Sequence, residues 1–126
     1  MASWKQIRKH VESKYSATVA SETLLSLIVS FPGGDIQLAF VGLEGNDDSG
    51  EWVEISSPIG RLTPKQLAQA VIAVNSRICG ALRGLDDGNV LLSHSFPAAV
   101  FSPKDFDWAL RAITATARSM ASDNPS

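Results

Sequence analysis

Residues 82–97 read LRGLDDGNVLLSHSFP, and this stretch decides the fold. At its centre, Asp86-Asp87-Gly88-Asn89 is a turn sequence, because an Asp-Gly pair supplies positive backbone φ angles at low steric cost. Apolar residues dominate on both sides of the turn, in the ranges Ala81–Leu85 and Val90–Phe96. The stretch therefore predicts a tight β-hairpin.

The hairpin is followed by a predicted amphipathic helix. Ser102 is a good N-cap residue, and Pro103 behind it suits the first helical position, where no backbone N–H is needed. Five apolar residues follow at steps of 4, 3, 4 and 3, on one helix face: Phe106, Leu110, Ile113, Ala117 and Met120. We expect the first four of these side chains to form part of the core.

A second helix is predicted upstream of the hairpin. Thr63-Pro64-Lys65-Gln66 combines an N-cap, a proline at the first helical position and a glutamine at the capping-box position. Apolar residues at steps of 4, 3 and 4 predict its core-facing stripe: Leu67, Val71, Val74 and Ile78. Gly80 is placed to end the helix.

The first half of the chain predicts one more helix and three strands. The helix is indicated by apolar residues at helical spacing: Trp4, Ile7, Val11 and Tyr15. Strands are expected at Thr23–Phe31, Asp35–Leu43 and Glu51–Ser57, with a polar loop at Gly45–Gly50. Period-2 alternation groups the side chains of the first two strands, with Leu25, Leu27, Val29 and Phe31 on one face, and Ile36, Leu38 and Phe40 likewise together.

The order of elements is α-β-β-β-α-β-β-α, which predicts an α+β domain. Its antiparallel-rich sheet of five strands should be flanked by the three helices. A chain of 126 residues fits a single domain, 1–126, and the polar tail 122–126 is expected to fray.

Composition excludes several classes of protein. The net charge of −2 and the pI near 5.6 argue against a nucleic-acid binder. Leu24–Phe31 is the longest hydrophobic region and is too short to cross a bilayer, so we expect no membrane partner. Cys79 is the single cysteine, which excludes an intrachain disulfide. The first 16 residues lack an apolar signal core, and we expect a cytoplasmic protein.

No segment carries a catalytic, metal-binding or cofactor-binding motif, so the sequence predicts no enzyme, no metal and no cofactor. His94 shares an apolar strand face with Val90, Leu92 and Phe96; it is the candidate pH-sensitive residue, although an ordinary hydrogen-bonded histidine is the simpler interpretation. The serines beside it, Ser93 and Ser95, point to the opposite face and cannot form a nucleophile–base pair with it.

His10 is interpreted as solvated, beside Lys9 and Lys14. Cys79, at a helix C-terminus, is interpreted as a small hydrophobic residue rather than a reactive thiolate. Asp47 and Asp48 lie in the polar loop, which lacks the alternating ligands of a calcium site.

Apolar residues also occupy the second face of the first three strands, where a solvated sheet would be polar. Leu24, Ile28, Ala39, Val41 and Trp52 are predicted to point that way. The candidate interface combines four of them with two helix residues: Leu24, Ile28, Val41, Trp52, Ile72 and Trp108. We expect a homodimer that uses part of this surface and a partner protein or peptide segment on the rest. Coverage of these residues within the monomer is the alternative.

Three segments carry a resemblance to a known family: residues 51–58 (EWVEISSP), residues 85–97, and the last helix with Ala115-Thr116-Ala117. They resemble the YbjN domain family of bacterial sensory-transduction regulators, and the order of elements resembles the type III secretion chaperone-like fold. The resemblance implies frequent homodimers and a chaperone-like or regulatory role, and it brings no catalytic motif.

Two functions are therefore kept. The first is a non-enzymatic protein-binding module. The alternative is a small-ligand-binding or enzymatic domain whose site is assembled from scattered residues, and a concave pocket with convergent polar groups would favour it.

Overall fold

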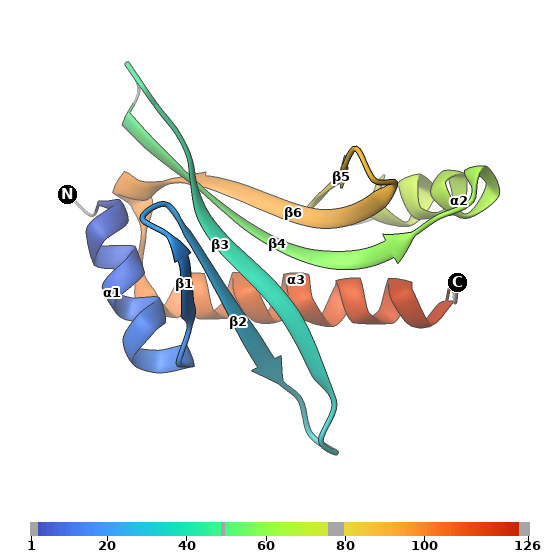
Figure 1. Cartoon of the computed structure of the whole chain (residues 1–126), viewed down its shortest axis with the longest axis horizontal. Helices are drawn as coiled ribbons and strands as arrows, with labels where there is room; N and C mark the ends of the chain where they lie inside the picture. Colours follow the sequence, from blue (N-terminus) through green and yellow to red (C-terminus); the bar gives the residue numbers. More distant parts are fainter. Residues whose placement is uncertain (1–2, 49, 76–79, 124–126) are drawn as a thin grey trace.

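The computed structural model describes residues 3–48, 50–75 and 80–123. The fold is α+β, with three α-helices and a six-stranded antiparallel sheet (Figure 1). The elements are α1 (Trp4–Tyr15), β1 (Thr18–Ser21), β2 (Leu24–Ser30), β3 (Ile36–Asp47), β4 (Gly50–Arg61), α2 (Pro64–Asn75), β5 (Ala81–Gly84), β6 (Asn89–Pro97), a short 3₁₀ turn (Ala98–Val100) and α3 (Pro103–Asp123).

The sheet has the strand order β1-β2-β3-β4-β6-β5, so the prediction of five strands is wrong by one. The additional strand is β1, whose four residues are all exposed and therefore show no alternation of buried and exposed positions. The predicted polar loop at Gly45–Gly50 is also wrong, because β3 continues to Asp47 and β4 begins at Gly50. Hydrogen bonds between the two strands continue past the apolar residues from which the strand ends were predicted.

The register of β3 corrects the predicted face of that strand. Val41 pairs with Leu25 and Ala39 pairs with Leu27, so Ala39 and Val41 point into the core and both are fully buried. Ile36, Leu38 and Phe40 lie on the opposite face. Because β3 is apolar on both faces, either set of its alternate residues could face the core. The pairing of β3 with β2 determines which set does.

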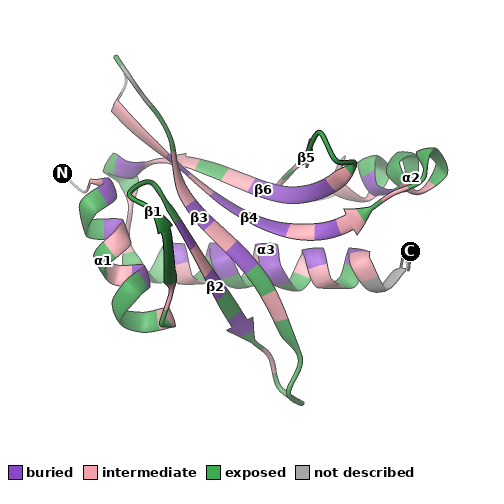
Figure 2. Ribbon diagram, viewed as in Figure 1, coloured by how far each residue is buried: buried purple, intermediate pink, exposed green. Residues whose placement is uncertain are grey.

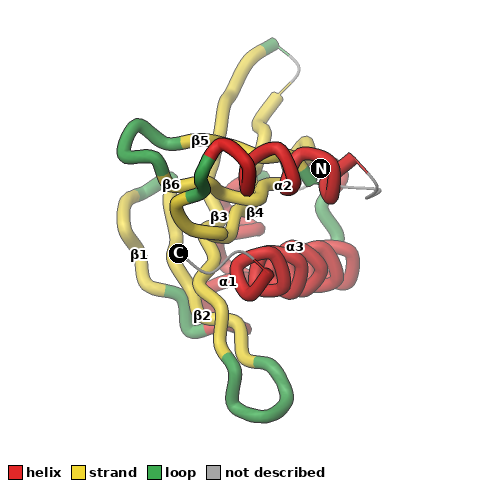
Figure 3. Tube along the Cα trace, turned by 90° about the vertical axis from the view of Figure 1, so that its right-hand side faces the viewer, coloured by secondary structure: helices red, strands yellow, loops and turns green. Residues whose placement is uncertain are grey.

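The core lies between the sheet and α1 and α3 (Figure 3). Helix α3 passes behind β2 and β3 in the view of Figure 1 and runs alongside β4, and its buried side faces the strands (Figure 2). All five stripe residues predicted for this helix are buried: Phe106, Leu110, Ile113, Ala117 and Met120. Helix α1 is present where the stripe predicts a helix, and it buries Trp4, Ile7 and Val11 in the same core.

Helix α2 corrects a second prediction. Its capping box is formed as predicted, with Thr63 N donating to Gln66 Oε1 at 2.9 Å and Gln66 N to Thr63 Oγ1 at 3.2 Å. Its stripe is wrong, because Leu67 and Val71 are 41% and 45% exposed. The small Ala70 is the buried residue instead.

Val74 is half-buried and packs against the core, as its place in the stripe predicts. The predicted core residue Ile78, and Cys79 beside it, lie outside the described residues. Because α2 is apolar around much of its circumference, helical spacing alone does not select the face that packs.

Candidate functional site

One face of the sheet presents apolar side chains to solvent. On β2 and β3 the residues that point away from the core are large apolar residues, serines or glycine: Leu24, Ser26, Ile28, Ser30, Ile36, Leu38, Phe40 and Gly42. We call this set the open face. Ile28 is 49% and Ile36 60% exposed, and Leu24 and Leu38 are each 37% exposed. None of the eight positions carries a charge.

Two of the predicted interface residues, Leu24 and Ile28, belong to the open face. Trp52 on β4 is half-buried and alternates with the buried Val53, which places it on the same side of the sheet. Val41 was placed wrongly, because it is fully buried in the core and cannot contribute to an exposed interface.

The other two predicted interface residues lie on helices. Ile72 on α2 is 70% exposed and Trp108, near the start of α3, is 67% exposed. Figure 1 places α2 and the start of α3 at opposite ends of the long axis. The six predicted residues therefore do not form one surface, and only Leu24, Ile28 and Trp52 lie on a common face.

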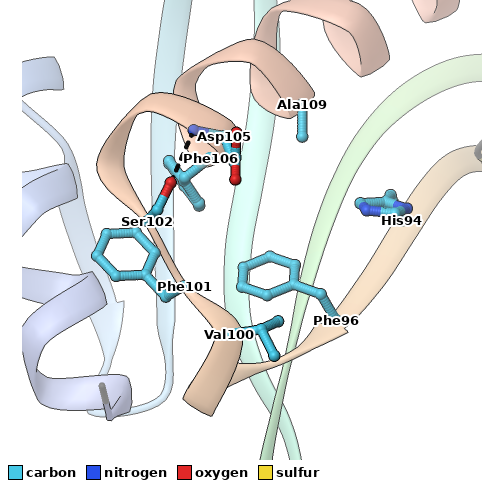
Figure 4. A pocket seen from close by; sticks show the side chains of 8 residues that line it. All are labelled: His94, Phe96, Val100, Phe101, Ser102, Asp105, Phe106 and Ala109. Carbon is cyan, nitrogen blue, oxygen red and sulfur yellow. Dashed lines mark hydrogen bonds between the residues drawn. The ribbon is translucent and has the colours of Figure 1, made fainter. Parts of the chain in front are cut away.

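A hollow with aromatic walls lies where β6, the 3₁₀ turn and the start of α3 meet (Figure 4). We call it the aromatic hollow, and its volume is about 160 Å³. Its lining residues are His94, Phe96, Val100, Phe101, Ser102, Asp105, Phe106 and Ala109. The Phe106 ring stands edge-on to Phe101 and Phe96, with ring centroids 5.8 and 6.2 Å away.

His94 lies on the face that the sequence predicts for it. It pairs with the buried Ile55, and its ring stacks on Phe96 with centroids 6.2 Å apart. The serines beside it pair across the other face, Ser93 with Ser56 and Ser95 with Glu54. This register separates both hydroxyls from the imidazole, as predicted.

The polar groups of the aromatic hollow are few. The Ser102 hydroxyl accepts a hydrogen bond from the Asp105 backbone N at 3.2 Å and so caps α3. Within the described part of the chain, the His94 ring and the Asp105 carboxylate make no hydrogen bond or ion pair. The hollow therefore offers one imidazole and one carboxylate above apolar walls.

His10 was predicted to be solvated, and this prediction is wrong. Its Nε2 atom lies 2.9 Å from Asp107 Oδ1, and its ring stands edge-on to Phe106 at 5.8 Å between centroids. Asp107 also accepts from Lys14 Nζ and from the Tyr15 hydroxyl, each at 2.5 Å. We call His10, Lys14, Tyr15 and Asp107 the α1–α3 cluster. No local pattern reveals it, because His10 and Asp107 are 97 positions apart.

The contacts within the α1–α3 cluster shift the pKa values of Asp107 and Tyr15. Burial acts to raise the pKa of Asp107, but hydrogen bonds from Lys14, Tyr15 and His10 outweigh it and hold the pKa below its ordinary value. Burial, together with the hydrogen bond to Asp107 and its negative charge, raises the pKa of Tyr15. The carboxylate is thus kept charged and the phenol neutral, which is the state that joins the two helices.

Metal ligands do not gather in the part of the chain that the structure describes, where no group of three His, Cys, Asp or Glu side chains could hold an ion. Asp48, half of the acidic pair in the predicted loop, is exposed. None of the helices over the described residues is long and apolar enough to cross a membrane.

No protein-family model matches the sequence, and no curated protein matches it.

Proposed function

We propose that this chain is a non-enzymatic protein-binding module with a chaperone-like or regulatory role, of the kind that its resemblance to YbjN domains implies. It acts in the cytoplasm as a homodimer joined through the open face. The observation that carries the proposal is the exposure of Ile28, Ile36 and Leu38 side by side on β2 and β3. A solvated antiparallel sheet normally alternates apolar and polar side chains, with the polar ones outward.

A second copy is the occupant that the chemistry of the open face favours. A two-fold axis brings the same patch together twice, so every charged group would meet its own counterpart. The eight outward positions on β2 and β3 carry no charge, and Glu54, which pairs with Gly42 on the same face, is paired with Arg83 at 2.6 Å, so such a meeting brings little like-charge repulsion. Two sheets that pack face to face form a common apolar layer, which would cover Ile28 and Leu38 in both copies.

The alternative function, a small-ligand or enzymatic domain, has less support. Small-molecule sites usually occupy about 300–1,000 Å³ and combine several polar groups. The aromatic hollow has a volume of about 160 Å³, and over the described residues two of its polar side chains, His94 and Asp105, make no hydrogen bond or ion pair. A wider hollow of about 320 Å³ beside the open face is lined by Glu44, Glu54 and Arg83, but the Glu54–Arg83 ion pair and the hydrogen bond from Ser95 to Glu44 already engage these charges. Over the described residues the Ser102 hydroxyl, which accepts a hydrogen bond from the Asp105 backbone N, makes no hydrogen bond with the His94 ring, so the aromatic hollow holds no formed nucleophile–base pair.

Sedimentation equilibrium at micromolar concentration tests the proposal. The wild-type chain is expected to be a dimer, and the double variant Ile28→Asp/Leu38→Asp a folded monomer. Ile72→Asp is the matched control, because Ile72 is more exposed than either residue but lies on α2. A monomeric wild-type chain would overturn the proposal. So would a dimer that survives the double variant and dissociates on Ile72→Asp, since the interface would then lie on α2.

A further inference from the structure

We infer that the aromatic hollow is an anchor site for a partner polypeptide, and that it takes one large apolar side chain whose neighbour in the partner is basic. This inference rests on the proposed function as a protein-binding module. It names a second surface, on the side of the molecule where β6 meets α3, and the chemistry of the segment that would occupy it.

The size of the hollow selects one side chain. A cavity of about 150 Å³ holds a benzene ring, and the hollow has a volume of about 160 Å³. Phe96, Phe101 and Phe106 supply ring edges and faces against which an aromatic or leucine side chain would pack. Interfaces commonly concentrate their binding energy in an apolar anchor of this kind.

The helix side of the hollow is held in place by the packing and capping of α3. Phe106 is only 3% exposed and is packed into the core, and Ser102 holds the first turn of α3 through its cap. Figure 4 shows Phe96 and Val100 on the strand and turn side and Ala109 on the helix side of the same space. Val100 is 66% exposed and provides an apolar rim. A site that needs no rearrangement loses little free energy to ordering when it binds.

The charge at the rim selects the neighbouring residue. The Asp105 carboxylate is exposed, and the His94 ring faces the hollow from β6 (Figure 4). Over the described ranges neither group has a hydrogen-bonding or ionic partner in the chain itself. A lysine or arginine beside the apolar anchor would donate to the Asp105 carboxylate, and the His94 ring offers a further hydrogen-bonding group at the same rim. The net charge of −2 also favours a basic partner over an acidic one.

Three blocked dipeptides test this chemistry directly: acetyl-Phe-Lys-amide, acetyl-Phe-Glu-amide and acetyl-Ala-Lys-amide. Each is titrated into the labelled full chain, and backbone amide shifts are followed by NMR. The Phe-Lys probe should shift the amides of His94, Phe96 and Ala109. It should bind about twofold to fivefold more tightly than Phe-Glu, the range expected of one exposed ion pair. The Ala-Lys probe should leave these amides unchanged.

Two variants separate the apolar from the charged contribution. Ala109→Leu fills the hollow and should abolish the shifts from both Phe probes. Asp105→Asn should remove the preference for Phe-Lys over Phe-Glu, whereas Asp86→Asn, an exposed carboxylate in the β5–β6 turn, should preserve it. Equal binding of the two Phe probes to the wild-type chain, or shifts confined to the open face, would overturn the inference.

The outcome is distinguishable from the test of the dimer. Ala109→Leu and Asp105→Asn leave the open face intact, so both variants should sediment as the wild-type chain does. A dimer without probe binding overturns the anchor site alone. Probe binding by a monomer supports the anchor site while it overturns the dimer.

Discussion

His10 Nε2 lies 2.9 Å from Asp107 Oδ1 and joins α1 to α3. The same carboxylate accepts from Lys14 and Tyr15, so one acidic side chain on α3 holds three residues of α1. Because these contacts depend on the charge of Asp107, the attachment of α1 should depend on pH.

Asp107→Asn should make the free energy of unfolding depend less on pH in the acidic range. The pKa of Asp107 in the folded chain lies below its ordinary value of 3.8. Its stabilising contribution is therefore complete above pH 3.8 and is lost as the pH falls through the folded-state value. Urea unfolding of the wild type and the variant at a series of acidic pH values measures the difference. Asp86→Asn, on the exposed β5–β6 turn, is the control, and identical slopes for wild type and Asp107→Asn would contradict the prediction.

Tyr15→Phe should affect the alkaline side instead. The pKa of the Tyr15 hydroxyl is raised above its ordinary value of 10.0. The corresponding stability is complete below pH 10 and declines as the pH rises towards the folded-state value, because the unfolded chain then loses its proton first. The wild type should lose stability above pH 10 more steeply than Tyr15→Phe, as followed by circular dichroism in urea. Parallel curves would show that the phenol is not held by Asp107.

Leu110→Ala should destabilise the domain by about 2–5 kcal/mol, the usual cost of truncating a fully buried leucine. Leu110 is 1% exposed and lies in the middle of the stripe that α3 presents to the sheet. Trp108→Ala on the same helix is the comparison, because Trp108 is 67% exposed and its removal should change the free energy of unfolding by less than about 0.5 kcal/mol. A larger loss for Trp108→Ala than for Leu110→Ala would place the wrong face of α3 against the sheet.

Two valine-to-alanine variants test which face of β3 and which face of α2 pack against the core. Val41→Ala should lower the free energy of unfolding by about 2 kcal/mol, because it removes buried methyl groups and leaves a cavity. Val71→Ala should change it by less than about 0.5 kcal/mol, since Val71 is 45% exposed and alanine favours the helix. Chemical denaturation of the two variants under one condition gives the comparison, and equal losses would refute the register of β3 or the orientation of α2.

The elements that local chemistry specifies could be predicted from the sequence. Ser102 caps α3 and Thr63 caps α2, and each helix begins at the proline that follows. The Asp87-Gly88 turn joins β5 and β6, with Gly88 at a φ of 89°. In each case a few neighbouring residues decide the backbone conformation, and no distant contact is needed.

Features that depend on distant contacts could not be predicted in the same way. Both faces of β3 are apolar enough to pack against a core. The pairing of β3 with β2 decides that Val41 is buried and Leu38 exposed. Strand β1 has no apolar pattern and exists because it pairs with β2. Within the candidate site, the alternation of side chains along β6 predicted the face on which His94 lies. The contact between His10 and Asp107 could not be predicted, because it depends on how α1 and α3 pack against each other.

The position of α3 has a consequence for synthesis on the ribosome. The sheet is complete once β6 has been made, but its inner face is covered largely by residues 103–123, which are translated after every strand of the sheet. Until Phe106 and Leu110 emerge, the nascent chain presents both faces of an apolar sheet, and His10 has no carboxylate to meet. We therefore expect folding of this domain to be completed only after α3 has left the exit tunnel, and the exposed apolar sheet makes the growing chain prone to aggregation until then.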